Sequence, residues 1–266
     1  MEKLITVLIP TYNNFELFSK LIKIYLKDSR VLILVSDDSN NLREKNLIEC
    51  YCQSNNIIYF QGPKSSPGEN WNYLLSMVKT PFFVLNHHDD YPDNLEFLDK
   101  LNSIKNGIIV LPCSSKVGNK PVQKIFSWQQ KYFSQICMFW PNACFNMILA
   151  PTASLIVNSR YKNVFFDSNL KWFIDAEWYS RLFFLASKDK NRILFYSYSR
   201  ILSFQAQNSI TKSLEKTLKK QIKTEKEYLR AKGLIPKRIF VIFQILFLIV
   251  ISLKSKLNRI SLIFYK

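Results

Sequence analysis

The stretch LITVLIPTYNN, from Leu4 to Asn14, decides the fold class. Its apolar first part is stopped by Pro10, which predicts a short buried strand. Asn13 or Asn14 then provides a helix cap, because apolar residues follow at helical spacing: Phe15, Phe18, Leu21, Ile22 and Leu26. The N-terminus is therefore predicted to be a strand followed directly by a helix.

The same alternation continues along the chain. Five later apolar runs of similar length predict strands at Val31–Ser36, Ile57–Phe60, Pro81–Asn86, Gly107–Pro112 and Ala153–Val157. Helix-like segments separate the first of them, and Asp175–Ser187 again has helical spacing. This pattern predicts an α/β fold with a mostly parallel sheet flanked by helices.

Polar segments follow the first four predicted strands: PTYNN, SDDSN, QGPKSSPG and NHHDDYPDN. Each alone also suits an ordinary turn, because Asp, Asn, Ser, Gly and Pro favour turns. In parallel α/β sheets, however, ligands bind beyond the carboxyl ends of the strands. Several such segments at one edge of a sheet therefore predict a ligand site there.

The segment NHHDD holds both histidines of the chain, His87 and His88, followed by Asp89 and Asp90. A structural zinc site is disfavoured, because it needs three or four protein ligands and the chain has neither a Cys-x-x-Cys pair nor a further His. A nucleophilic dyad is disfavoured too, because no Ser or Cys stands in a nucleophile context. A site for a hard cation and a plain polar turn both stay open.

The net charge of +17 is concentrated at the C-terminal end, since residues 212–266 hold 14 Lys or Arg and 3 Asp or Glu. A charged helix is predicted from Ser209, ending near Gly233 and Pro236. The uncharged run Ile239–Leu253 is shorter than the roughly 20 residues of a membrane-spanning helix and has Lys or Arg on both sides. It is expected to lie at an anionic membrane surface, with packing on the domain as the alternative.

Two further expectations come from composition. The five Cys are odd in number, and the N-terminus lacks the features of a secretory signal, so a reduced, cytoplasmic setting is expected. The pI of about 9.6 would also suit a nucleic-acid-binding protein. Nucleic acid is not expected as a partner, however, because the basic charge is interleaved with an apolar run and no nucleic-acid motif is present.

Taken in order, VLIPTYNN, SDDSN, NHHDD and DAEWYSRL resemble the inverting GT-A glycosyltransferases of family 2, over roughly Leu4 to Thr211. Many members build bacterial O-antigens, capsules and other surface polysaccharides. The resemblance implies a Rossmann-like GT-A fold with a C-terminal basic, apolar helical extension. It assigns residues 1–105 to nucleotide-sugar binding, 106–211 to acceptor binding and catalysis, and 212–266 to membrane association.

The resemblance also implies a donor site. It places Pro10, Thr11, Tyr12 and Asn14 around the nucleoside, with Asp37 or Asp38 hydrogen-bonded to the base. Asp38 is favoured, because it directly precedes the Ser-Asn turn. The helix beginning ENWN stands where the family often has ARN, which brings Asn70, and beside it Trp71, towards the pocket without the usual Arg.

The family's metal motif, Asp-x-Asp, aligns with HHDD and implies Mn²⁺ or Mg²⁺ as cofactor. His87 then takes the first Asp position and Asp89 the second, so Asp89 is the main expected ligand and His87 a replacement. His88 stands at the variable position, and Asp90 is expected to face the diphosphate or the acceptor. A cation there would neutralise the diphosphate leaving group.

The resemblance supplies the catalytic base from a helix start. With Arg181 aligned to the family's Arg, Asp175 takes the base position, Ile174 replaces the preceding acid, and Glu177 is the alternative. A helix places Asp175 and Glu177 on different faces, so they cannot share the role. Both also suit a helix N-terminus simply because of its dipole.

The implied reaction is transfer of a hexose from a nucleotide sugar, expected to be UDP-linked, to a polyprenyl-diphosphate-linked glycan. The implied location is the cytoplasmic face of the bacterial inner membrane, peripheral or monotopic. The alternative is a basic membrane- or nucleic-acid-binding protein with an inactive glycosyltransferase-like domain. A sugar-phosphate nucleotidyltransferase is disfavoured, because VLIPTYNN has no Gly for a phosphate loop.

Overall fold

The computed structural model describes residues 2–104, 106–117, 120–123, 136–137, 144–145, 151–189, 192–204 and 217–234. The first part of the chain alternates strands and helices: β1 (Ile5–Thr11), α1 (Phe15–Tyr25), β2 (Val31–Asp37), α2 (Leu42–Ser54), β3 (Ile58–Gln61), α3 (Pro67–Ser76) and β4 (Phe82–Leu85). Each strand lies within two residues of the run that predicted it. The predicted strand-helix alternation is therefore confirmed.

The second part of the chain is less regular. Its elements are β5 (Asp90–Pro92), α4 (Leu98–Leu101), β6 (Gly107–Val110), β7 (Cys113–Val117), β8 (Lys120–Gln123), the 3-10 turns η2 (Thr152–Ser154) and η3 (Ser159–Tyr161), β9 (Leu155–Asn158), α6 (Ile174–Lys188), β10 (Arg192–Phe195), β11 (Ile201–Phe204) and α8 (Leu218–Ala231). Strands β5, β7, β8, β10 and β11 were not predicted from the sequence.

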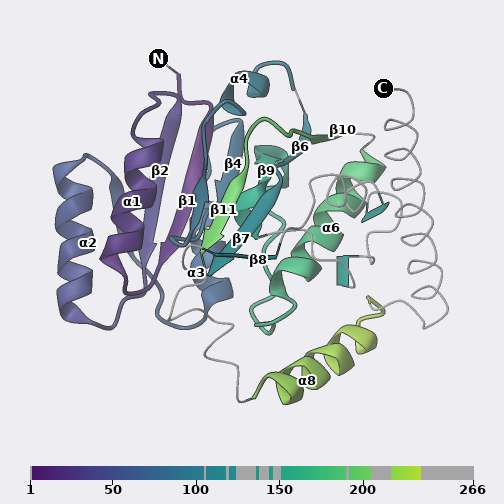
Figure 1. Ribbon diagram of the computed structural model, residues 1–266. Helices are drawn as coiled ribbons and strands as arrows, with labels where there is room; N and C mark the ends of the chain where they lie inside the picture. Colours follow the sequence, from purple (N-terminus) through teal and green to yellow (C-terminus); the bar gives the residue numbers. More distant parts are fainter. Residues whose placement is uncertain are drawn as a thin grey trace.

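Seven strands form the central sheet, in the order β10-β6-β9-β4-β1-β2-β3 (Figure 1). All neighbouring pairs are parallel except those of β9, which runs antiparallel to β4 and β6. The prediction of a mostly parallel α/β sheet is thus confirmed. A second, four-stranded sheet has the order β5-β11-β7-β8 and adjoins the carboxyl end of β4 through β5.

The two faces of the central sheet bury two apolar clusters. Ile5, Val7 and Ile9 of β1 pack with α1, α2 and α4, whereas Leu8 packs with α3 and α6 on the opposite face. This alternation follows from the two-residue period of a strand. In Figure 1, α1 and α2 accordingly lie on one side of the sheet and α6 on the other. The side chain of Leu229 in α8 packs into the same apolar cluster as α3 and α6.

Local signals explain the helix ends. Asn14, rather than Asn13, caps α1 by accepting a hydrogen bond from the N–H of Leu17. Ser66 caps α3, and Pro67 occupies its first turn, so this helix begins two residues before the predicted Glu69. At the other end of the chain, Gly233 has φ +70°, a conformation that favours Gly and ends α8.

The C-terminal predictions are only partly covered. The structure describes the charged helix as α8, whereas residues 209–216 and the run Ile239–Leu253 lie outside the described residues. Among the residues that are described, no helix combines the length and the apolar character that crossing a bilayer requires.

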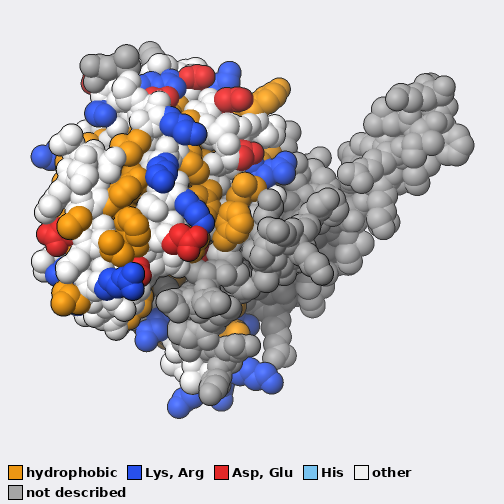
Figure 2. All heavy atoms as spheres, turned by 60° about the vertical axis from the view of Figure 1, so that its left-hand side comes forward, with side chains coloured by type: hydrophobic (Ala, Val, Ile, Leu, Met, Phe, Trp, Pro, Cys, Tyr) orange, Lys and Arg blue, Asp and Glu red, His pale blue; other side chains and the backbone are white. Residues whose placement is uncertain are grey.

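The surface beside α1 and α2 has mixed charge. Figure 2, which brings the left-hand side of Figure 1 forward, shows Lys and Arg interspersed with Asp, Glu and hydrophobic side chains. A face of this kind does not create a field of a single sign. By contrast, α8 carries five Lys or Arg and two Glu, one of them buried.

Candidate active site

The carboxyl ends of β1, β2, β3 and β4 meet at one edge of the central sheet. Thr11 is level with Asp37 in the register of β1 and β2. The N–H of Asp38 donates to the carbonyl of Thr11 at 3.0 Å, and the N–H of Gly62 donates to the carbonyl of Asp37 at 3.0 Å. The N–H of Asn86 donates to Leu8 in the same way, at 2.8 Å. The polar segments of the sequence are therefore brought together, as predicted.

The loop after β1 is built on positive φ angles. Asn13 has φ 44° and Asn14 has φ 104°, and Asn tolerates such angles better than most residues. The Glu44 carboxylate accepts hydrogen bonds from the N–H groups of Asn14 and Phe15, at 2.9 and 2.6 Å. The side chain of Asn14 is thus occupied with capping α1, and a contact between it and the nucleotide stays a prediction.

Of the residues just before this loop, two are buried and one has an exposed aromatic ring. Pro10 and Thr11 are buried, and the Oγ1 atom of Thr11 has no hydrogen-bond partner among the described residues. Tyr12 is 43% exposed. An aromatic ring that faces solvent beside an unpaired buried hydroxyl suits a flat, polar ligand such as a nucleoside.

The two carboxylates after β2 have different surroundings. Asp37 is buried and accepts hydrogen bonds from the Ser39 N–H at 2.8 Å and the Tyr59 hydroxyl at 3.1 Å, so it fixes the turn. Asp38 is half-buried and accepts from the Lys64 N–H at 2.8 Å. Burial is the main cause that raises the pKa of Asp38 above its ordinary value. Asp38 is thus the less engaged of the two carboxylates, and its contact with the base of a nucleotide stays a prediction.

Gly62 and Asn70 complete this corner. A Cβ atom on Gly62 would lie 2.2 Å from Oδ1 of Asp38 and 3.1 Å from Oδ1 of Asn70, so a side chain here would displace both. Asn70 is buried, its Nδ2 donates weakly to the carbonyl of Ser36 at 3.4 Å, and its Oδ1 has no partner among the described residues. The structure therefore brings Asn70 next to Asp38.

Asn86 holds the turn that follows β4. Its side-chain amide donates to the carbonyls of His87 and Asp90, at 2.8 and 2.7 Å, and its Oδ1 accepts from the Tyr25 hydroxyl at 2.6 Å. Asn86 is fully buried. The turn is also tied to the second sheet, because the Phe204 N–H donates to the carbonyl of Asp89 at 2.8 Å.

Three side chains of this turn converge. One ligand atom from each of His87, Asp89 and Asp90 lies within 4.8 Å of the others, and Nδ1 of His87 is 4.0 Å from Oδ2 of Asp90. Burial lowers the pKa of His87 to about 4 and also lowers the pKa of His88, so both imidazoles are neutral at pH 7. Burial, together with the Asp89 and Asp175 carboxylates, raises the pKa of Asp90 well above its ordinary value.

This donor set fits a divalent cation. Two carboxylates and a neutral imidazole suit Mn²⁺, and Mg²⁺ prefers the carboxylates. Nε2 of His87 is buried and has no hydrogen-bond partner among the described residues. A cation would also offset the repulsion that raises the pKa of Asp90. Asp90 lies inside the cluster, although the sequence assigned it to the diphosphate or the acceptor rather than to the metal.

Trp71 packs against the His87 side of the cluster. Its ring lies 4.7 Å from the His87 ring, centroid to centroid, and Trp71 is almost fully buried. Its other neighbour is Phe166, at 4.9 Å and edge-on, and Phe166 stacks on Trp178 of α6 at 4.4 Å. The aromatic rings therefore connect the turn after β4 to the helix that carries the predicted base.

Asp175 lies in the first turn of α6. Its Oδ1 is buried without a hydrogen-bond partner among the described residues, and burial raises its pKa to about 7. Its charge in turn contributes to the raised pKa values of Asp90 and Tyr179. Asp175 therefore lies near enough to the cluster of His87, Asp89 and Asp90 to act on its charge, and a carboxylate with a pKa near 7 suits a general base.

Glu177 has a different environment. It is 3% exposed, and its two oxygens accept hydrogen bonds from Nε and a terminal nitrogen of Arg181, each at 2.6 Å. The same guanidinium donates to the carbonyl of Phe165. Glu177 is thus fully engaged in an ion pair that holds the loop before α6. Asp175, by contrast, has an oxygen without a hydrogen-bond partner among the described residues, and the choice between the two as base stays a prediction.

With this geometry in view, the comparison with known families is decisive. The sequence pattern described as "Glycosyl transferase family 2" matches residues 6–183. The chain belongs to this family. The match spans β1 to most of α6, and so it includes every residue of the candidate active site from Pro10 to Glu177. Among curated proteins, none matches the chain.

Solved structures support the GT-A fold of this glycosyltransferase. The crystal structure of S. aureus TarS 1–349 in complex with UDP-GlcNAc has a TM-score of 0.59 and 16% identity, over 80% of this chain and 61% of that one. S. aureus TarS 1–349 in complex with UDP has a TM-score of 0.54 and 18% identity, over 77% and 61%. The chain thus spans about three fifths of the length of these structures.

Three features of the glycosyltransferase site were not predicted from the sequence. Asn86 was assigned only to the end of a strand, although an Asn that ends a buried strand beside a turn is a signal for side-chain capping of the turn. The pair formed by Glu177 and Arg181 has the i, i+4 spacing of helical ion pairs. Ser203 lies opposite Asp90 in the pairing of β5 and β11. The sequence could not predict this neighbour, because the two residues are far apart along the chain.

Proposed function

We propose that this family 2 glycosyltransferase transfers a hexose from a UDP-linked sugar to a polyprenyl-diphosphate-linked glycan acceptor, with inversion at the anomeric carbon. The observation that carries the proposal is the position of Asp175. Its carboxylate has a buried Oδ1 and a pKa of about 7, and its charge acts on Asp90 of the cluster of His87, Asp89 and Asp90. A base beside a diphosphate-binding cluster is what single displacement requires.

The donor would lie across the carboxyl ends of β1, β2 and β4. Asp38, with Asn70 beside it, would hydrogen-bond the base, and the ring of Tyr12 would lie along the nucleoside. TarS, similar in fold, has been crystallised with UDP-GlcNAc and with UDP, which supports a UDP-linked donor. In this proposal residues 1–105 bind the nucleotide sugar, and residues 106–211 bind the acceptor and supply the base.

Asp89 and His87 would hold Mn²⁺ or Mg²⁺, with Asp90 as a third ligand. When bound, the cation would supply positive charge to the diphosphate of the leaving group. Asn86 keeps the ligands in place, because its amide binds the carbonyls on both sides of the turn. Trp71 shields one side of His87 from water. His88 is neutral and would donate or accept a hydrogen bond at the diphosphate.

Asp175 would act on the acceptor. In a single displacement, its carboxylate takes the proton from the attacking hydroxyl as the oxygen bonds to the anomeric carbon. The bond between that carbon and the diphosphate breaks at the same time, and UDP leaves with the electron pair. Removing the proton from the hydroxyl matters because a neutral alcohol is a weak nucleophile.

The distribution of charge supports the proposed acceptor and location. The basic helix α8 and residues 212–266 as a whole would bind an anionic membrane surface, where a polyprenyl-linked acceptor lies. The proposed location is the cytoplasmic face of a bacterial inner membrane, and the proposed role is the synthesis of a surface polysaccharide such as O-antigen or capsule.

A donor screen tests the reaction. The purified protein is incubated with a panel of UDP- and GDP-sugars and an acceptor extract, with and without Mn²⁺, and the released nucleotide is measured. We expect release from a UDP-hexose that needs Mn²⁺ or Mg²⁺. The matched variant Asp89→Ala should lose at least tenfold in cation-dependent UDP affinity, because it removes the main expected ligand. Unchanged turnover in the variant, or no release from any sugar, would contradict the proposal.

A further inference from the structure

One carboxylate outside the active site is buried in an unusual way. Glu225, in the middle of the strongly basic helix α8, is only 2% exposed. Its oxygens accept hydrogen bonds from the backbone N–H groups of Lys171 at 2.8 Å, Trp172 at 3.1 Å and Phe173 at 2.9 Å. Burying a carboxylate is costly unless hydrogen bonds compensate for the lost water, and here three consecutive N–H groups do so.

These three N–H groups belong to the entry of α6. Phe173 is the N-cap residue of α6. Its side chain makes no capping hydrogen bond to the first turn of the helix. Of the three N–H groups, only that of Phe173 is one of the free N–H groups of the helix start, which attract negative charge. Glu225 therefore holds the segment that leads into α6, from another helix more than fifty residues further along the chain.

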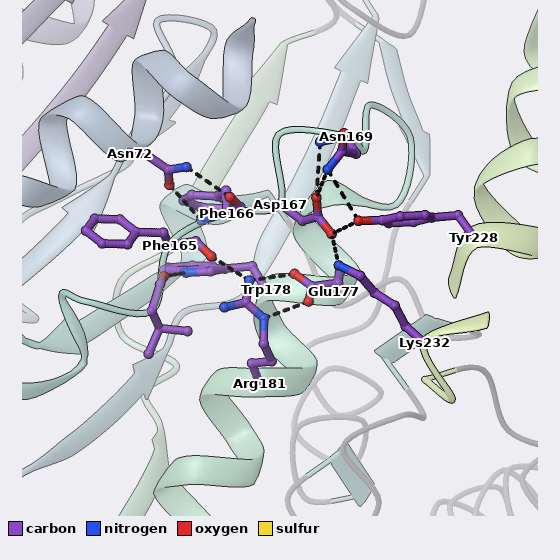
Figure 3. A network of polar contacts seen from close by, with 11 residues as sticks. Asn72, Phe165, Phe166, Asp167, Asn169, Glu177, Trp178, Arg181, Tyr228 and Lys232 are labelled. Atoms are coloured by element: carbon purple, nitrogen blue, oxygen red, sulfur yellow. Dashed lines mark hydrogen bonds and ion pairs between the residues drawn. The ribbon is translucent and has the colours of Figure 1, made fainter. Parts of the chain in front are cut away.

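A second contact joins α8 to the same loop. The Asp167 carboxylate accepts hydrogen bonds from the Tyr228 hydroxyl at 2.8 Å and from Nζ of Lys232 at 2.6 Å (Figure 3). Asn169 donates to Asp167 as well, at 3.0 Å. These partners lower the pKa of Asp167 to about 2 against the effect of burial, so it is ionised at all ordinary pH values. Figure 3 shows Tyr228 and Lys232 reaching this carboxylate from the side of α8.

The opposite side of the loop is fixed by the catalytic domain. Asn72 of α3 exchanges two hydrogen bonds with the backbone of Phe166, at 2.6 and 2.9 Å, and Nε1 of Trp178 donates to the carbonyl of Val164 at 2.6 Å (Figure 3). Residues 164–173 are thus held from both sides before α6 begins. The backbone N–H groups of residues 171–173, which end two residues before Asp175, are bound from the α8 side by Glu225.

We propose that Glu225 is a positioning residue for Asp175: its carboxylate fixes the entry of α6 and thereby the direction of the base towards the acceptor. The C-terminal helix α8 then belongs to the catalytic unit as well as to the surface that would meet the membrane. This inference rests on the proposed function, because it assigns Asp175 the role of base. Glu225 itself touches no reacting group.

The test compares Glu225→Gln with Glu227→Gln. Glu227 lies two residues further along α8 and is exposed, so its variant makes the same chemical change without touching the loop. In E225Q an amide NH₂ replaces one acceptor oxygen and opposes the backbone N–H groups. We expect kcat to fall at least tenfold, with KM for the donor changed less than twofold. E227Q should retain wild-type values.

A structural measurement keeps the inference separate from the reaction. Hydrogen–deuterium exchange of the segment 168–180 should become at least tenfold faster in E225Q, with no change in E227Q. A wild-type protein inactive with every sugar would overturn the proposed function, whereas the exchange result would still decide whether Glu225 fixes the entry of α6. Unchanged exchange, or a loss of kcat matched by an equal loss of UDP binding, would overturn the positioning role.

A milder variant covers the case in which E225Q does not fold. Tyr228→Phe removes only the hydroxyl that donates to Asp167 and leaves the ring in place. We expect kcat to fall two- to fivefold with KM for the donor unchanged, together with faster exchange in residues 165–173. A folded Y228F with wild-type kcat and wild-type exchange would contradict the inference that α8 holds this loop in place.

Discussion

Asp175 shows how one residue can be chemically prepared by its surroundings. Nothing among the described residues hydrogen-bonds its Oδ1, and burial raises its pKa to about 7. A carboxylate in ordinary contact with water has a pKa near 4 and is too weak a base to take a proton from a hydroxyl. Glu177, two residues on, has its charge neutralised by Arg181 instead.

The substitution Asp175→Asn tests this difference. We expect kcat to fall at least a thousandfold, because an amide cannot accept the acceptor's proton, while UDP affinity stays within a factor of about two. In the wild type, the base must be ionised, so kcat should rise with pH through a midpoint near 7. Single-turnover kinetics from pH 5 to pH 9 would measure both. A flat profile, or transfer retained by D175N, would contradict the assignment.

The same pKa has a consequence for stability. Because the folded-state pKa of Asp175 lies above its unfolded value, the folded protein binds more protons between about pH 4 and pH 7, and stability falls as pH rises through that window. D175N removes this penalty. Its free energy of unfolding at pH 8 should exceed that of the wild type by about 1–3 kcal/mol, whereas at pH 4 the two should agree.

At the residue scale, the sequence predicted several positions that lie at the candidate site. It did not predict which side chains would hydrogen-bond or form ion pairs with each other there. Asp38 and Asp89 were found because they follow strands. The ion pair of Glu177 and the buried bonds of Asp37 to Ser39 and Tyr59 were not, because they depend on where side chains point in the folded chain. Sequence spacing alone does not fix this.

At the scale of elements, the turn between β4 and β5 is the critical unit. It is short, it carries two of the three possible cation ligands, and the third, Asp90, begins β5; Asn86 holds the turn on one side and β11 on the other. Strand β5 has only three residues, so its pairing with β11 is short and its position also depends on the hydrogen bonds of Asn86. The geometry of the cluster therefore depends on the buried amide.

Asn86→Ala should loosen this turn. It leaves the Tyr25 hydroxyl and the carbonyls of His87 and Asp90 without their partner, so we expect a loss of about 2–4 kcal/mol in the free energy of unfolding. Cation-dependent UDP affinity should fall at least tenfold. The matched control Tyr25→Phe removes one bond and leaves the two carbonyl contacts, so it should lose about 1–2 kcal/mol and keep UDP affinity. Equal effects of both variants on UDP affinity, measured by calorimetry, would contradict this role of Asn86.

The elements also show where prediction from sequence ends. Strands β1, β2 and β4 were predicted because they are buried on both faces and have continuous apolar runs. Strands β5, β7 and β11 were missed, since they are three to five residues long and pair across long stretches of chain. Such strands are defined by their partners, and no local pattern distinguishes them from loop.

At the scale of the whole molecule, the glycosyltransferase domain and the basic charge occupy successive parts of the chain. The family match ends within α6, at residue 183, and the excess positive charge follows it. Helix α8 is already anchored to the catalytic domain by Leu229 and Glu225, with its Lys residues exposed. If α8 meets a membrane as proposed, its attachment to the catalytic domain would orient the site relative to that membrane as well.

Deleting residues 239–266 tests how this attachment works. These residues include the uncharged run Ile239–Leu253 and end in a basic, aromatic stretch, whereas α8 remains. If the run inserts into the lipid interface, the truncated protein should leave the membrane fraction. It should keep its UDP affinity and melting temperature, because the residues assigned to the site all precede residue 239. Residual binding to anionic vesicles through α8 should then disappear at high salt, since exposed charges are screened. If the run instead packs on the domain, the truncation should lower the melting temperature and leave membrane binding unchanged, which flotation assays and thermal unfolding of the same samples would distinguish.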